Sequence, residues 1–523
     1  MRTKRLSSAI SLGTEFSPSR EKLPRHSGLC WPLRIWHENN VRRSVIVTLT
    51  GVFLAFVSAS PSLAGGYYVG DVGTRGMARG GAFVAAPNSL LSIHYNPSGL
   101  ALLDGGFHLS GDLNLVDYTS TYARKCPCVD GELADAELLD QELSESFIGR
   151  TAEETRGLQE IPYIGMAYGF DWNHLTIGLA VYGPQGPRRF SFSAPGAKPS
   201  EQPQRYSSLS VEVSEAYYSL VVAASPVKGL RLGFGAQLYQ FATRQELTLW
   251  ANSGLITTPE DADWDIPTTV EFASSIMPNW TFGASYDILP GLTVGASVIG
   301  QRSIRADGTS EIQLPPSVAS IAAIEGSEIQ LEINLPPIWR LGLQYQEPKW
   351  FAAEIAVVYE AWHVYDYARI RSKDVNIILN DEAVKLATID LPYNFEDTWS
   401  LRIGGEFDHF APYVTVYGGY FYEPSAVPEA NKDLSSPDLD KHGFSGGLAT
   451  KWFGTTLTLG AQYITLEETS ITDSERKLVG PLPAPSGSDE LLTTIANGNY
   501  DGNYFIVSAS LSAAFDEILG TIK

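Results

Sequence analysis

The stretch Leu175-Thr-Ile-Gly-Leu-Ala-Val-Tyr182 decides the fold, because large aliphatic residues in it alternate strictly with small or polar ones. Successive side chains of a β-strand point to opposite faces, so one face of this stretch is apolar. A membrane β-barrel needs this pattern, since one face of each strand meets lipid and the other lines the interior. We therefore expect Leu175–Tyr182 to be one strand of such a barrel.

The same alternation returns along the chain, between clusters of Gly, Pro, Asn and Asp. We predict fourteen strands: Phe107–Tyr122, Ile161–Phe170, Leu175–Tyr182, Leu209–Ala224, Leu230–Trp250, Asn279–Tyr286, Leu292–Arg305, Ile338–Gln346, Trp350–Ile370, Asp397–Phe407, Tyr413–Tyr422, His442–Trp452, Thr456–Leu466 and Tyr504–Phe515. Short turns and long loops alternate between them, as in an even-stranded barrel with both ends in the periplasm. The expected fold is all-β: a transmembrane antiparallel β-barrel of about 14 strands over residues 106–515, followed by a short tail at 516–523.

Aromatic residues make up 11% of the chain and gather near the ends of the predicted strands, as at Trp172, Trp339 and Trp350. This placement suits the aromatic girdles of a membrane protein, and ordinary strand propensity accounts for it equally well. The last predicted strand ends on Phe515, which resembles the assembly signal of bacterial outer-membrane barrels. Residues Asp516–Lys523 extend beyond that position.

Residues 1–64 read as a leader and signal peptide. Val45–Val57 is an apolar run of thirteen residues, shorter than the ~20 that a spanning helix needs. A charged pair, Arg42-Arg43, precedes it and small residues follow, so we expect cleavage near Ala64-Gly65. Residues 1–40 have no hydrophobic period; they are either a long leader or the product of a misassigned start, with translation beginning at Val41.

Residues 65–105 have the composition of a tightly turned plug. Seven glycines fall between Gly65 and Gly81, and glycine permits backbone angles that a side chain would forbid. We expect this segment to form an N-terminal hatch that lies in the lumen of the barrel and closes it.

The chain is acidic, with a formal net charge of -22. Residues 1–64 hold nine Lys/Arg and three Asp/Glu, which leaves 28 and 56, or -28, for the rest. A surface this acidic argues against nucleic-acid binding, which needs clustered positive charge. The loop acids either solvate the surface or bridge divalent cations to an anionic surface. Cys126 and Cys128, two positions apart, are expected to form a local disulfide or to remain free thiols, and metal binding is the weakest alternative.

Several stretches resemble the FadL family of outer-membrane transporters for long-chain fatty acids and aromatic hydrocarbons (FadL/TodX-type). They are Arg79-Gly-Gly-Ala-Phe-Val84, Tyr95-Asn-Pro-Ser-Gly-Leu100, Gly183-Pro-Gln-Gly186 with Arg205-Tyr206, Leu335-Pro-Pro-Ile-Trp-Arg-Leu-Gly342, Glu360-Ala-Trp362, Asp397–Phe407 and Gly418–Pro428. Ser98 stands where the family signature Asn-Pro-Ala has its Ala. The resemblance extends from Gly65 to Phe515, and the order of the motifs carries it more than any one of them.

This resemblance implies a fourteen-stranded barrel with a hatch, ligand capture at the outer face and passage to a lateral opening near the third strand. The implied gate residues of the hatch are Phe83, Val84, Asn96, Pro97 and Ser98. For Asn96-Pro97 the alternative is a purely structural turn, because proline fixes its own backbone angle and restricts its neighbour.

Gly178, Gly183 and Pro184 are the candidates for the lateral opening. Proline cannot donate a hydrogen bond to the sheet, so Gly183-Pro184 is either a break in the wall or an ordinary strand end. Arg188, Arg189 and Arg205 are the candidates for pairing with a ligand carboxylate; otherwise they are loop cations that meet acidic neighbours or lipopolysaccharide.

No motif in the sequence indicates catalysis. The chain has no phosphate-binding loop, no His-Glu-x-x-His helix and no Gly-x-Ser-x-Gly elbow, and His94 reads as a hydrogen-bonded plug residue. We therefore expect a passive transporter, not an enzyme, with no cofactor and no metal site. It would lie in the bacterial outer membrane as a monomer, contacting lipid and lipopolysaccharide, and carry long-chain fatty acids or other hydrophobic compounds. A structural or adhesive barrel with acidic ligand-binding loops is the first alternative, and a lipid-modifying barrel enzyme is the second.

Overall fold

The computed structural model of the protein describes residues 71–125, 150–154, 157–183, 189–193, 196–250, 261–320, 322–347, 350–379, 382–411, 413–435, 438–476 and 494–515. All of these residues belong to one compact unit, Ser62–Lys523. The predictions for the leader, for Cys126 and Cys128, for Pro184 and Arg188 and for the tail lie outside the described residues.

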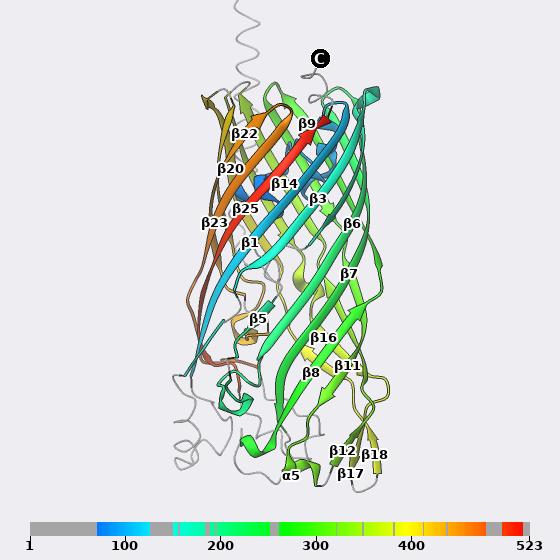
Figure 1. Ribbon diagram of the computed structural model, residues 1–523, viewed down its shortest axis with the longest axis vertical. Helices are drawn as coiled ribbons and strands as arrows, with labels where there is room; N and C mark the ends of the chain where they lie inside the picture. Colours follow the sequence, from blue (N-terminus) through cyan, green and yellow to red (C-terminus); the bar gives the residue numbers. More distant parts are fainter. Residues whose placement is uncertain are drawn as a thin grey trace, which may run out of the picture. The chain divides into compact units, whose positions relative to one another are not determined.

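Fourteen antiparallel strands close into a barrel in this unit (Figure 1), as the sequence predicts. In order around the wall they are β1 (Gly106–Arg124), β3 (Gln159–Phe170), β4 (Leu175–Tyr182), β6 (Ser210–Val227), β7 (Leu230–Trp250), β9 (Met277–Leu289), β10 (Leu292–Ile299), β14 (Ile338–Glu347), β15 (Phe351–Glu360), β20 (Thr398–Ala411), β21 (Val414–Glu423), β22 (Lys441–Trp452), β23 (Thr455–Leu466) and β25 (Gly498–Ala514). Each strand pairs with the next, and β25 pairs with β1 from His108↔Ala514 to Arg124↔Gly498. Closure leaves no open sheet edge, which a spanning sheet requires in lipid.

Strand β4 shows why this sequence folds into a wall. Ile177, Leu179 and Val181 are 39%, 48% and 47% exposed on the outer face. Between them, Thr176, Gly178, Ala180 and Tyr182 are buried against the interior. The period of two therefore separates an apolar outside from a small or polar inside, as a barrel in lipid needs. Aromatic residues near strand ends also face outward, for example Trp172 and Trp452, at 71% and 73% exposed.

Two of the predicted strands are interrupted. The predicted strand Leu292–Arg305 divides into β10 and β11 (Arg302–Ile312), and Trp350–Ile370 divides into β15 and β16 (Tyr367–Ser372). After β15 the chain turns through η6 (Trp362–Val364), where the buried Trp362 indole donates to Glu360 Oε2 at 2.7 Å. Burial of this large side chain, together with its hydrogen bond, ends the strand.

The long connections also contain strands, which the sequence did not predict. Several extend the barrel sheet: β2 (Thr151–Glu153), β5 (Arg189–Ser191), β8 (Asp265–Ser274), β11, β13 (Glu328–Leu335), β16, β19 (Ile389–Pro392) and β24 (Thr469–Ile471). A separate small sheet of β12 (Ala322–Glu325), β17 (Asn376–Leu379) and β18 (Glu382–Lys385) lies with α5 (Pro316–Ala319) at the long-loop end, low in Figure 1. The turns and long connections also contain the short helices η3 (Trp172–His174), η4 (Pro199–Glu201), η5 (Ala262–Trp264) and η7 (Glu429–Asn431). None of the helices in the described part of the chain is long and apolar enough to cross a membrane.

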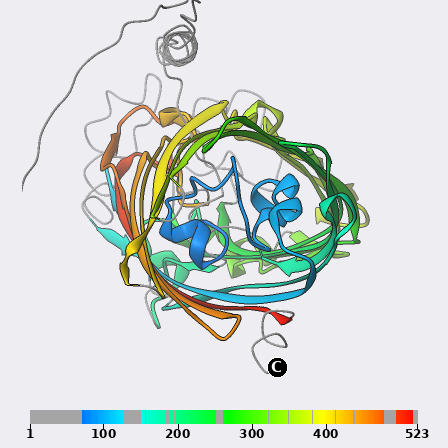
Figure 2. The same ribbon diagram turned by 90° about the horizontal axis from the view of Figure 1, so that it is seen from above.

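Residues 71–105, here called the lumen segment, lie inside the ring of strands (Figure 2). The segment contains α2 (Thr74–Ala78), α3 (Ser92–Tyr95) and η1 (Pro97–Leu102), joined by turns. Gly73, Gly80 and Gly81 have φ of 71°, 60° and 74°, a region that favours glycine, so the helices remain short. Phe83, Ile93 and Leu100 are fully buried. The segment packs close to the short-turn end, because it contacts β7 and β10 within a few residues of where those strands begin.

Candidate functional site

Glycines in the wall let the lumen segment lie directly on the strands, with backbone against some of them and side chains against the others. These glycines, here called the glycine belt, are Gly178, Gly233, Gly283, Gly295, Gly342, Gly404, Gly419, Gly447 and Gly460. Eight of them face one another in pairs across neighbouring strands: Gly233↔Gly283, Gly295↔Gly342, Gly404↔Gly419 and Gly447↔Gly460. A Cβ at Gly233 would lie 2.3 Å from the carbonyl carbon of Pro97, and one at Gly283 would lie 2.0 Å from Asn96 Oδ1. The belt therefore forms a close-fitting seat for the lumen segment.

Ion pairs fix the first half of the lumen segment, residues Asp71–Ala85, to β20. Asp71 Oδ1 lies 2.8 Å from Arg402 Nη1, and Arg75 Nη2 lies 2.8 Å from Glu406 Oε2. Arg402 also pairs with Glu423 of β21 at 2.6 Å. Burial raises the pKa of Asp71, and the adjacent Arg402 guanidinium opposes this shift. The network holds charge inside the barrel by pairing it, as buried charge requires.

One carboxylate, that of Glu354 on β15, holds the turn that contains two predicted gate residues. Its Oε1 accepts hydrogen bonds from the backbone N–H of Val84 at 2.5 Å and of Ala85 at 3.0 Å. Its Oε2 lies 3.5 Å from Arg79 Nη2. Beside this turn the Arg75 and Arg79 guanidiniums lie 5.2 Å and 5.0 Å from the centre of the Phe83 ring, within cation–π range.

The Asn96 side chain links the turn at Val84 to the turn at Ser98 and also bonds to the wall. Its Nδ2 donates to the carbonyl of Val84 at 2.8 Å and to that of Ala284 on β9 at 3.2 Å. Its Oδ1 accepts from the N–H and the hydroxyl of Ser98, at 3.1 Å and 2.8 Å. Four of the five predicted gate residues thus meet here: Val84, Asn96 and Ser98 through hydrogen bonds, and Pro97 through its contact with Gly233. Their gating role remains a prediction.

The wall changes register where β4 ends, at the predicted lateral opening. Pairing of β4 with β6 ends at Tyr182↔Tyr217 and resumes with β5 at Arg189↔Glu212. Between these two pairings the chain advances seven residues (189 − 182) while β6 advances five (217 − 212), so the register differs by two residues between them. Gly183 N–H still donates to Pro162 O at 3.4 Å. Gly178 lies deeper in β4, where a Cβ would meet Leu100 at 2.8 Å.

The two described arginines among the predicted carboxylate ligands differ in environment. Arg205 is buried, pairs with Asp265 at 2.9 Å and stacks on the Tyr206 ring at 4.3 Å. Arg189 is exposed in β5, and its backbone N–H and carbonyl bond the side chain of Gln159, each at 2.8 Å. Their role in ligand binding remains a prediction.

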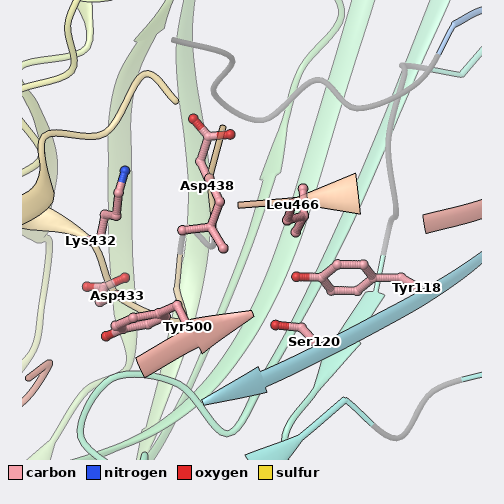
Figure 3. Close-up of a pocket in the computed structure, with 8 residues that line it drawn as sticks. Tyr118, Ser120, Lys432, Asp433, Asp438, Leu466 and Tyr500 are labelled. Atoms are coloured by element: carbon pink, nitrogen blue, oxygen red, sulfur yellow. The ribbon is translucent and has the colours of Figure 1, made fainter. Parts of the chain in front are cut away.

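A small pocket lies between the wall and the loop after β21 (Figure 3). Tyr118, Ser120, Lys432, Asp433, Asp438, Leu439, Leu466 and Tyr500 line it. Lys432 Nζ donates to Ser425 Oγ at 2.7 Å and to Val427 O at 2.9 Å. The pocket has room for about one water molecule, too little for an alkyl chain.

Sequence reasoning missed the wall residues that hold the lumen segment. Glu354, Arg402 and Glu406 lie at inward positions of alternating strands, where charge is unusual, and that position is the signal that could have identified them. Their partners are more than 250 positions away in the chain, so the pairs themselves could not be read from the sequence.

Comparisons with known proteins agree with this architecture. Among solved structures, a Pseudomonas aeruginosa FadL homologue aligns with a TM-score of 0.67 at 14% identity, covering 86% of this chain and 100% of its own. The Pseudomonas putida toluene transporter TodX aligns with a TM-score of 0.59 at 12% identity, covering 85% of this chain and 99% of its own. At these identities the likeness shows the fold.

Curated relatives match over shorter stretches. The long-chain fatty acid transport protein of Escherichia coli O6:H1 is 21% identical over 211 residues, which cover 38% of this chain and 44% of that protein. The protein of the same name from Escherichia coli K12 is 25% identical over 123 residues, 22% of this chain and 24% of that protein. The chain thus spans less than half the length of these relatives.

The family model for outer membrane protein transport proteins (OMPP1/FadL/TodX) matches residues 54–515, which include the whole barrel and the lumen segment. This match covers most of the chain and agrees with the fold of the solved relatives. The family consists of transport channels, not enzymes. The chain therefore belongs to the OMPP1/FadL/TodX family of outer-membrane transport proteins.

Proposed function

We propose that the protein carries hydrophobic compounds, first of all long-chain fatty acids, passively across the outer membrane. The ligand is captured at the long-loop end, which faces outward, and the lumen segment then rearranges. The ligand leaves sideways through the wall where β4 ends. The observation that supports this most strongly is the close fit of the lumen segment on the glycine belt, because a segment seated directly on the wall would hinder free diffusion through the lumen.

The physical requirements of the ligand fit a closed barrel. A hydrophobic solute crosses the polar outer leaflet poorly but needs no water-filled pore once it reaches the bilayer. Lateral release through the register change between Tyr182 and Arg189 would deliver it to lipid, and the paired charges around Glu354 and Arg402 would keep the barrel closed to ions meanwhile. No cofactor enters this scheme.

Two ligand classes are suggested by the names of similar proteins. The curated relatives are long-chain fatty acid transport proteins, and solved relatives include toluene transporters. Both ligands are apolar in most of their surface, and only the fatty acid carries a carboxylate.

The proposal is tested by measuring uptake while a disulfide bond holds the lumen segment against the wall. A Cβ built at Gly460 lies 3.5 Å from Ala78 Cβ, within the range of about 3.5–4.5 Å that a disulfide spans. Ala78→Cys with Gly460→Cys, in a background of Cys126→Ser and Cys128→Ser, should therefore form a disulfide between α2 and β23. We expect the oxidised variant to lose most uptake of labelled oleate in a strain lacking its own transporter, and reduction to restore it.

The control is Gly460→Cys alone, which cannot form the bond and should transport equally in both redox states. Uptake that persists fully in the oxidised variant would show that this half of the segment need not move. Absence of oleate and toluene uptake in the unmodified protein would overturn the transport function and favour an adhesive barrel.

A further inference from the structure

Two of the long loops fold into the mouth of the barrel. The loop between β4 and β6 is buried without interruption over residues 202–209, here called the first mouth loop. The loop between β21 and β22 is buried over 424–427, 431–434 and 438–439, and its described residues from 424 to 440 are here called the second mouth loop. Connecting segments ordinarily run over the surface, because their backbone groups need water. Burial of these two loops therefore requires hydrogen-bond partners inside the mouth.

The two mouth loops come from nearly opposite sides of the ring and meet. β4 and β6 are the third and fourth of the fourteen strands around the wall, whereas β21 and β22 are the eleventh and twelfth. The backbone N–H of Leu434 donates to Ser207 Oγ at 3.0 Å, and both residues are buried. Phe192, which follows β5, belongs to one apolar cluster with Leu434 and Leu439 and with tyrosines of β1 and β25. A hydrogen bond and an apolar cluster thus join the loops across the mouth.

An arginine of a third loop, the one after β24, also holds the second mouth loop. Arg476 is 8% exposed, and its Nε lies 3.0 Å from Asp433 Oδ2. The same Nε donates to the carbonyl of Asn431 at 3.0 Å, and the guanidinium lies 4.5 Å from the centre of the Tyr393 ring. Removing one partner of a buried ion pair is strongly destabilising, because the other charge stays buried without compensation. The Asp433–Arg476 pair is therefore the strongest tie of this loop.

The mouth loops lie nearer to the long-loop end than the lumen segment does. On the inner face of β1 the lumen segment bonds to Asp112 and Asn114. Ser120, six residues beyond Asn114 (120 − 114), lines the small pocket together with Asp433 and Asp438 of the second mouth loop (Figure 3). Six residues of strand span about 20 Å. The barrel therefore holds two separate layers in series, one on the glycine belt and one at the mouth.

We propose that the two mouth loops form an outer closure, separate from the lumen segment, that shuts the lumen to polar solutes from outside. The closure opens when the second mouth loop leaves Ser207 and Arg476. Because the two layers are in series, a solute crosses only when both are open, and loosening either one raises the conductance of the barrel. The inference goes beyond the proposed transport function, because it does not depend on which compound is carried.

The closure is tested by labelling a cysteine beneath the second mouth loop. Ser120→Cys, in a background of Cys126→Ser and Cys128→Ser, places a thiol in a pocket with room for about one water molecule, too small for a charged methanethiosulfonate reagent. In intact cells of a strain without general porins, reagent added outside should label this thiol slowly. Arg476→Ala should accelerate labelling by at least about 10-fold, because it strands a buried carboxylate. Ser207→Ala removes one neutral acceptor and should accelerate labelling by about 2- to 10-fold.

Two control variants separate the outer closure from other parts of the molecule. Arg369→Ala breaks an ion pair with Asp390 in the long-loop region where both side chains reach solvent, and should change labelling by less than about 2-fold. Glu354→Ala loosens the lumen segment on the far side of Ser120 and should also leave labelling from outside unchanged.

Fast labelling of Ser120→Cys without a further substitution would overturn the inference, because the mouth would then be open. Equal acceleration by Arg476→Ala and by either control would overturn it too, and so would the absence of acceleration in a folded, heat-modifiable Arg476→Ala barrel. If Arg476→Ala does not fold, Ser207→Ala decides by the same criteria. None of these outcomes bears on whether the protein carries hydrophobic compounds, which the uptake of oleate and toluene measures.

Discussion

The first half of the lumen segment is held by charge, and the second half by neutral hydrogen bonds and fit. Residues Asp71–Ala85 meet the carboxylates and guanidiniums of β15 and β20. Residues Ser92–Leu102 are held by the amide of Asn96 and by packing on Gly178, Gly233 and Gly283. Breaking a buried ion pair typically costs several times as much as losing one neutral hydrogen bond. The comparison teaches that the first half is the stronger anchor and that the second half is released first.

Removal of the Glu354 carboxylate should weaken docking of the first half more than any other change that we predict. Glu354→Ala leaves the Arg79 guanidinium and the N–H groups of Val84 and Ala85 without their shared acceptor. We expect a loss of about 3–5 kcal/mol in the free energy that keeps this half docked. Hydrogen exchange of the amides of residues 82–86 measures that loss, and single-channel conductance in planar bilayers should rise.

Glu354→Gln, which keeps an acceptor oxygen, should cost less than the alanine. Glu271→Ala is the control, because Glu271 pairs with Arg244 where both side chains are about half exposed, and we expect an effect under about 1 kcal/mol. Unchanged exchange in Glu354→Ala would contradict the assignment of this half as the anchor.

The fit of the second half is tested by adding one methyl group. A Cβ at Gly283 would lie 2.0 Å from Asn96 Oδ1, whereas one at Gly418 meets nothing within 4 Å. Gly283→Ala should therefore cost about 1–3 kcal/mol in docking, the usual penalty of overpacking. Gly418→Ala should leave docking unchanged. The measurement is hydrogen exchange of residues 92–100, with residues 76–81 as an internal reference; equal acceleration in both ranges would contradict independent halves.

Much of the wall follows from the sequence, because alternation with period two is a local property. All fourteen barrel strands are predicted within a few residues of at least one end, and β4 shows the predicted inward and outward faces residue by residue. The interruption at Trp362 was not predicted, since it depends on burial of the indole and on its bond to Glu360. Strand patterns also cannot show that long loops continue the sheet beyond the barrel.

The site is less predictable, for a physical reason. Resemblance indicated Val84, Asn96, Pro97 and Ser98, which the structure brings together. The wall residues that hold them depend on which inward positions of distant strands face the lumen segment, and that follows from strand stagger, not from local pattern. Glu354 and Gly283 could be assigned to the inner face from alternation, but not to Ala85 and Asn96 as partners.

The smallest effect that we expect is a difference between the two halves in how their docking depends on pH. Burial lowers the pKa of His94, with further lowering by Arg340, Arg302 and Arg402, while the Tyr95 and Tyr182 rings that also face it are neutral. Docked His94 therefore binds no proton, whereas undocked His94 titrates near 6.5. Below that pH the undocked state binds more protons, so docking weakens as pH falls, by at most about 1.4 kcal/mol per pH unit.

Hydrogen exchange of residues 92–100 between pH 7.5 and 5.5, corrected for the intrinsic rate, measures this slope, and His94→Gln should abolish it. Docking of the first half should not weaken in the same way as pH falls, because its buried carboxylates are paired. Asp71 is its closest titratable counterpart: burial raises its pKa, so protonation favours the docked state as pH falls, opposite in sign to His94. Parallel slopes in both halves would mean that the segment undocks as one body. Opposite signs on two sides of one short segment are what two halves that undock separately require.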